Sequence, residues 1–118
     1  MAIAVTAEKN SLATKYGADG LFGTVFTADP GATGTATGEV TGGAPAFARK
    51  SLVWGAPTAG VVTATGVFDI PAGTTVAFVG VCSTGVAAAA TLLDKLAVTS
   101  QLFSVQGTYT VTFTFTLT

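Results

Sequence analysis

Charged side chains, the first candidates for chemistry in any protein, are scarce in this chain and gather between residues 26 and 54. This stretch reads FTADPGATGTATGEVTGGAPAFARKSLVW, and it contains Asp29, Glu39, Arg49, Lys50 and the single tryptophan, Trp54. Two carboxylates in one loop are the starting point for an acid–base pair or for a calcium site. The alternative is that these polar groups hold the loop in shape or present it to a partner.

The rest of the sequence lacks the residues that most catalytic and metal sites require. It has no histidine and one cysteine, Cys82, so the usual general base near neutral pH and the common zinc ligand sets are missing. It contains neither a Gly-x-Ser-x-Gly motif nor a phosphate-binding loop motif. Its six carboxylates are scattered, whereas calcium takes six or more oxygen ligands. We therefore expect no catalytic residue, no cofactor and no metal, and a buried Cys82.

Within the loop, the charged residues favour structural roles. Asp29 precedes Pro30-Gly31, where an aspartate accepts hydrogen bonds from the amides of its own turn. Glu39 and Arg49 are expected to form an ion pair across the base of the loop. A bidentate, partly buried pair would hold the loop more firmly than an exposed one, which contributes about 0–1 kcal/mol.

Two interpretations of the loop's aromatic residues remain open. Trp54 and Phe47 are either anchors of the hydrophobic core or platforms on which a sugar ring stacks. Because Leu52 and Trp54 share one face of an extended segment, the core is the favoured location.

The composition points to one small domain whose surface is covered by partners. Of the 118 residues, 49% are hydrophobic and 9% are charged, with a net charge of −1. A surface with so little charge tends to associate, so we expect a homo-oligomer, a trimer or a dimer. The chain has no basic patch for nucleic acid, and its apolar runs are far shorter than the roughly 20 residues that span a membrane.

A regular alternation over the last residues gives the clearest local prediction. Tyr109, Val111, Phe113, Phe115 and Leu117 alternate with threonines, and a period of two predicts a strand with one apolar and one threonine face. Glycine and proline turns separate further expected elements: a strand at Ile3–Thr6, a short helix at Glu8–Tyr16, and strands at Leu21–Thr27, Ser51–Trp54, Gly60–Thr65, Val67–Ile70, Thr75–Cys82 and Leu92–Thr99.

These elements predict an all-β fold, a single-domain antiparallel β-sandwich of jelly-roll-like type with a short N-terminal helix. It spans residues 1–118, with a strand-and-helix arm at 1–20 and a β core at 21–118. In Thr75–Cys82 we expect Val76, Phe78 and Gly80 on one face and Ala77, Val79 and Val81 on the other, both buried. The stretch Val86–Ala90 fits a helix or a strand. Residues 1–6 are expected to add a strand to a neighbouring molecule.

Several segments of the chain carry a resemblance to a known family. They are TADPGATG at 27–34, GEVTGGAPAFARK at 38–50 with Trp54, FDIPAGTT at 68–75 followed by Val79-Gly80-Val81, and QGTYTV at 106–111. They resemble a family of small β-proteins of actinobacteriophages, usually labelled tail fibre or minor tail protein. The resemblance covers most of residues 21–118, and it implies a virion structural protein without enzymatic activity.

The shape expected of the chain narrows that implication. It has no heptads, collagen-like repeats or β-helix period from which a fibre shaft is built. We therefore expect a capsid decoration or minor capsid protein, located in the virion after assembly in the host cytoplasm, with the major capsid protein or other virion proteins as partners. The alternative is a tail or tail-fibre module that binds a host-surface glycan.

Overall fold

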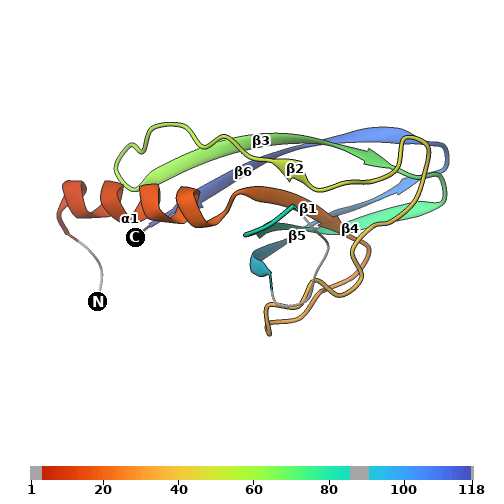
Figure 1. The fold of residues 1–118 in the computed structure, drawn as a ribbon, viewed down its shortest axis with the longest axis horizontal. Helices are drawn as coiled ribbons and strands as arrows, with labels where there is room; N and C mark the ends of the chain where they lie inside the picture. Colours follow the sequence, from red (N-terminus) through yellow and green to blue (C-terminus); the bar gives the residue numbers. More distant parts are fainter. Residues whose placement is uncertain (1–3, 86–90, 118) are drawn as a thin grey trace.

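The computed structural model describes residues 4–85 and 91–117, and it forms two packed antiparallel sheets with one helix at their end (Figure 1). The larger sheet has the strand order β2-β1-β4-β5, and the smaller one pairs β3 with β6. The elements are α1 (Thr6–Asp19), β1 (Phe22–Phe26), β2 (Lys50–Ser51), β3 (Val61–Ile70), β4 (Thr74–Cys82), β5 (Leu92–Phe103) and β6 (Gly107–Thr116). The predicted fold class, an all-β antiparallel sandwich with an N-terminal helix, is confirmed.

The N-terminal helix is longer than predicted, and the strand expected before it is wrong where it is described. α1 begins at Thr6, so this residue belongs to the helix, and Ala4 and Val5 belong to no strand. Residues 1–3 and the ambiguous stretch 86–90 lie outside the described residues. The helix buries Ala13, and the side-chain oxygen of Asn10 accepts a hydrogen bond from the Gly60 amide at 2.9 Å, which fixes the helix against the start of β3.

The smaller sheet confirms the alternation of the last strand and corrects the expected break at Gly66. β3 pairs with β6 without interruption from Val61↔Thr116 to Ile70↔Gly107, and Gly66 lies opposite Val111. A Cβ atom at position 66 would lie 3.0 Å from the ring of Phe68. The glycine therefore makes room for a core aromatic ring and does not end the strand.

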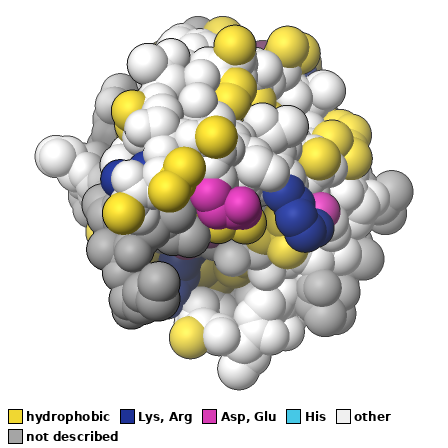
Figure 2. All heavy atoms as spheres, turned by 90° about the vertical axis from the view of Figure 1, so that its left-hand side faces the viewer, with side chains coloured by type: hydrophobic (Ala, Val, Ile, Leu, Met, Phe, Trp, Pro, Cys, Tyr) yellow, Lys and Arg dark blue, Asp and Glu magenta, His cyan; other side chains and the backbone are white. Residues whose placement is uncertain are grey.

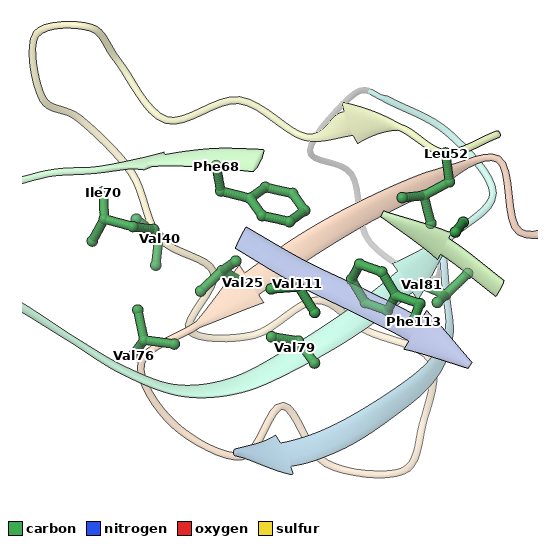
Figure 3. Packing of buried hydrophobic residues seen from close by; sticks show 11 residues of the cluster. Val25, Val40, Leu52, Phe68, Ile70, Val76, Val79, Val81, Val111 and Phe113 are labelled. Carbon is green, nitrogen blue, oxygen red and sulfur yellow. The ribbon is translucent and has the colours of Figure 1, made fainter. Parts of the chain in front are cut away.

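The main core lies between the two sheets, with side chains of both pointing toward each other (Figure 3). It corrects the predicted faces of β4, because Val76 packs in the same cluster as Val79 and Val81. The reason is a register shift between Val76 and Phe78 where β4 pairs with β5, which breaks the strict alternation of side chains. The cluster contains Val25, Val40, Leu52, Ala64, Phe68, Ile70, Val76, Val79, Val81, Val111 and Phe113.

The opposite face of the larger sheet is also buried, as predicted for β4, and a loop covers it. Phe26, Cys82 and Leu92 form a second cluster with the partly buried Phe22, Ala36 and Phe78. Ala36 belongs to the long connection between β1 and β2. The connection is bonded to the sheet at both sides, since the Leu92 amide donates to the Gly34 carbonyl at 2.9 Å and the Val40 amide to the Val25 carbonyl at 3.0 Å. We call residues 27–49 the covering loop.

Candidate functional site

The predicted ion pair between Glu39 and Arg49 lies at the base of the covering loop and is almost completely buried. The Arg49 Nε donates to Glu39 Oε2 at 2.6 Å and its Nη2 to Oε1 at 3.0 Å, so the pair is bidentate. Only 1% of the arginine side chain and 8% of the glutamate side chain are exposed. The expected ion pair is confirmed, and it meets the two conditions under which it would hold the loop firmly, burial and bidentate geometry.

Arg49 also reaches across to the end of β4 and the start of β5. Its Nη1 donates to the Thr84 carbonyl at 2.9 Å and to the Thr91 Oγ1 at 3.0 Å. Glu39 Oε2, which accepts from Arg49 Nε, also accepts a hydrogen bond from Thr24, a fully buried threonine of β1. The pair of Glu39 and Arg49 thus joins the covering loop to β1, to the segment after β4 and to the residue before β5. Sequence reasoning missed both Thr24 and the Thr84 carbonyl, since a lone threonine and a backbone atom have no distinguishing pattern.

Asp29 forms the predicted turn, with the Gly31 amide donating to its Oδ1 at 2.8 Å. Gly31 has φ +86°, a conformation that glycine adopts without strain. The structure adds an ion pair between Asp29 and Lys95 of β5, which sequence reasoning had not identified. Hydrogen bonding from Lys95, and then from the Gly31 amide, holds the pKa of Asp29 below its usual value. Lys50, the fourth charged residue of the stretch, pairs with Asp69 at 3.6 Å.

Trp54 and Phe47 lie against the core, which is the interpretation that the sequence favoured. The indole Nε1 of Trp54 donates to the Gly20 carbonyl at 2.7 Å, and its ring meets Tyr16 edge to face at 5.6 Å. Phe47 stacks on Phe68 with ring centroids 6.1 Å apart. Both aromatic rings are partly buried and engaged by neighbours of the same chain, so neither is presented as a free stacking platform.

Cys82 is fully buried in the second cluster, as predicted. Burial raises the pKa of its thiol to about 11, against an opposing effect of the nearby Arg49. The thiolate is the reactive form of cysteine, so this thiol is a poor nucleophile at neutral pH. Among the described residues, no cluster of three or more cysteine, aspartate or glutamate side chains could hold a metal ion. The helix in this part of the chain is too short and too polar to cross a membrane.

An open groove of about 360 Å³ lies between β6 and the pair β4–β5, and sequence reasoning did not predict it. Tyr16 closes one end: its ring stacks on Phe115 at 3.9 Å and its hydroxyl donates to Asp94 at 3.2 Å. Burial, and then the adjacent Asp94, raises the pKa of the Tyr16 hydroxyl. Leu96, Val98, Val111 and Phe113 contribute apolar walls.

β5 leaves much apolar surface uncovered. Leu96 is 66% exposed and Leu102 is 63% exposed, on a strand that forms the edge of the larger sheet. Figure 2 shows the end of the molecule at which α1 lies, where charged side chains are few among backbone and uncharged atoms. The arrangement as a whole combines a loop held by a buried ion pair with an open apolar groove.

Comparison with protein-family models, with curated proteins and with solved structures gives no match to this chain.

Proposed function

We propose that this protein is a non-enzymatic structural component of a tailed-phage virion, a capsid decoration or minor capsid protein that docks in several copies. The observation that carries the proposal is the uncovered edge strand β5. It exposes three leucines, Leu93, Leu96 and Leu102, in a chain with 9% charged residues. Uncovered apolar surface on a weakly charged protein is typical of a surface that another protein covers.

The residues that carry the family resemblance also support this proposal. Asp29, Glu39 and Arg49 all take part in contacts that fix the covering loop, and Trp54 anchors the chain after it. The motif thus serves to shape a rigid surface, which is what a docking protein requires. By binding the assembled shell, such a protein stabilises the particle through linkage alone.

The alternative is a tail or tail-fibre module that binds a host-surface glycan. It is supported by the label that the resembled family usually carries, tail fibre or minor tail protein. Its structural support is weaker, because Trp54, Phe47 and Tyr109 all pack against the core. Tyr109, the third aromatic residue considered, meets Phe103 edge to face at 6.1 Å. A sugar-binding version would need other residues.

A reconstruction of the intact virion tests the proposal. We expect the protein on the capsid shell, in many copies around symmetry axes. Particles that lack it should retain part of their infectivity and lose resistance to heat, and purified protein added back should restore that resistance. Location on the tail alone, together with unchanged heat resistance of the deficient particles, would overturn the capsid version.

A further inference from the structure

The smaller sheet has too few strands to cover the larger one. Where β3 and β6 form one layer, the other layer contains four strands, and β5 lies at its edge. Among the described strands, β6 pairs only with β3, so its second edge has unpaired backbone donors and acceptors. The position beside β6 and above β5 is therefore a place in the sandwich at which a strand is missing.

The groove described above occupies this position. On the side of β5 it is lined by Leu96 and Val98, and on the side of β6 by Phe113 and Phe115. Thr112 also lines it, although the side chain of this residue lies on the outer face of β6. The groove therefore reaches the free edge of β6, and an entering strand could bond to that edge while its side chains fill the apolar space.

The segment before α1 has the pattern that such a strand requires. Ile3 and Val5 alternate with Ala2 and Ala4, so a strand formed by this segment has two large apolar side chains on one face. Val5 has extended backbone angles, φ −97° and ψ 121°, and is 63% exposed. Val5 therefore presents an extended, exposed apolar side chain immediately before the helix.

α1 begins at Thr6, and this start of the helix lies at the outer end of the molecule (Figure 1). Tyr16 closes the near end of the groove, and Val5 lies eleven positions before it, which is ~16 Å at the rise of an α-helix. Five extended residues span at most ~17 Å. Residues 1–5 would thus only return to the mouth of their own groove and could not lie along it. We propose that residues 1–5 of a second copy of this chain fill the groove as a strand added to β6.

This inference deepens the proposed function, on which its biological setting rests. Strand addition between copies would link the molecules on a shell, and it would cover Leu96 and the free edge of β6 together. It also gives the N-terminal segment, predicted from sequence to reach a neighbour, a specific acceptor.

Cysteine cross-linking between two populations of the full-length protein tests the placement. One population carries Ile3→Cys and the other Leu96→Cys, and they are mixed under mild oxidation. We expect a disulfide between the tryptic peptides 1–9 and 96–118, found by mass spectrometry. Replacing Leu96→Cys by Val53→Cys, at a valine that is 84% exposed and does not line the groove, gives the matched control, which should not cross-link.

Sedimentation of the unmodified chain provides the second readout. The wild-type protein should be oligomeric, whereas Val5→Asp and Leu96→Asp should each shift it to the mass of one chain. Both positions are more than half exposed, so circular dichroism spectra and melting of the monomer should stay unchanged. Val53→Asp should leave the oligomer intact. A monomeric wild type, or an oligomer that survives both groove-directed substitutions, would overturn the inference.

The two proposals fail in different ways. Cross-links from Ile3→Cys to Leu96→Cys in a protein absent from virions would retain the strand addition and refute the virion role. A virion protein that is monomeric in solution and forms no such cross-link on the particle would retain the role and refute the strand addition.

Discussion

The two faces of the β4–β5 pair are both apolar, but they are covered in different ways. The outer face is apolar at Phe78, Cys82 and Leu92, and the protein's own covering loop buries it. The inner face is apolar at Val79 and Val81 near β6, but it is bare where Leu96 lies at the edge. The covering loop, held by a buried ion pair, closes the outer face. The inner face stays open beside β6, where we propose that one strand is added.

The few charged residues of the chain are distributed unequally between these two sides. The closed side uses Glu39 and Arg49, buried and bidentate, together with the exposed pair of Asp29 and Lys95. Two charged residues, Asp94 and Lys95, line the open groove, and Asp94 accepts a hydrogen bond from Tyr16. Ion pairs therefore hold the closed side in its folded arrangement. The side that we propose binds a partner is mainly apolar.

The largest effect is expected where the closed side depends on Arg49. Arg49→Ala should lower the free energy of unfolding by about 3–5 kcal/mol, because it leaves the buried Glu39 carboxylate without its partner. Urea denaturation followed by tryptophan fluorescence measures the change. Limited proteolysis should then cleave the covering loop, since the guanidinium no longer ties it to Thr84 and Thr91.

An exposed ion pair provides the control for this substitution. Lys15 and Asp19 lie one helical turn apart with side chains 72% and 56% exposed. Lys15→Ala should change the unfolding free energy by no more than about 1 kcal/mol. Equal effects of Arg49→Ala and Lys15→Ala would show that the buried pair does not hold the loop.

A smaller contrast is expected from one substitution on each side of the sheet. A Cβ at Gly80 would lie 2.8 Å from both Leu92 and Phe26 in the closed cluster, so Gly80→Ala should cost about 1–3 kcal/mol of stability through overpacking. On the open side, Leu96→Thr keeps a strand-forming residue at an exposed site and should change monomer stability by about 0.5 kcal/mol or less.

Both variants are compared by thermal melting at a protein concentration at which the chain is monomeric. A loss of stability in Leu96→Thr as large as that in Gly80→Ala would mean that the open side is part of the monomer's core. The comparison of the two faces would then be wrong.

Local patterns predicted the strand β6 and the ion pair of the closed side. The alternation in β6 was readable because a period of two needs no knowledge of the partner strand. The pairing of Glu39 with Arg49 was readable because the chain has few charged residues among which to choose. Gly66 was misread, since glycine weakens strands in general, whereas its role here depends on the ring of Phe68.

The open side could not be predicted in the same way. Its groove exists because one sheet has four strands and the other has two, which is a property of long-range pairing. The shift of Val76 into the main core depends on irregular pairing between β4 and β5, and β5 itself shows no sign of it in sequence. Tyr16 was recognised only as a helix residue, although it closes the groove.

The smallest effect is expected at Asp29 and Lys95, where the covering loop meets β5. The pKa of Asp29 is lowered first by Lys95 and then by the Gly31 amide, so Lys95→Met should raise it only part of the way to the usual value. NMR titration of the Asp29 carboxyl carbon measures both pKa values. A lowered pKa in the folded state means that this group stabilises the fold above the carboxyl's unfolded pKa, and that the contribution is lost as pH falls through the folded one.

Because the pair is exposed, its loss should barely change the melting temperature at neutral pH. Lys95→Met should leave the oligomer and its cross-link to Leu96→Cys unchanged, since the Lys95 ammonium group pairs with Asp29 of the covering loop, although Lys95 and Leu96 both line the groove. Because this variant lacks the tryptic site at position 95, the cross-link is read between the peptides 1–9 and 51–118. If Lys95→Met dissociated the oligomer, the loop-facing and groove-facing sides of β5 would not act independently. The contrast between a side closed by ion pairs and a side open for a partner would then be wrong, because β5 belongs to both sides.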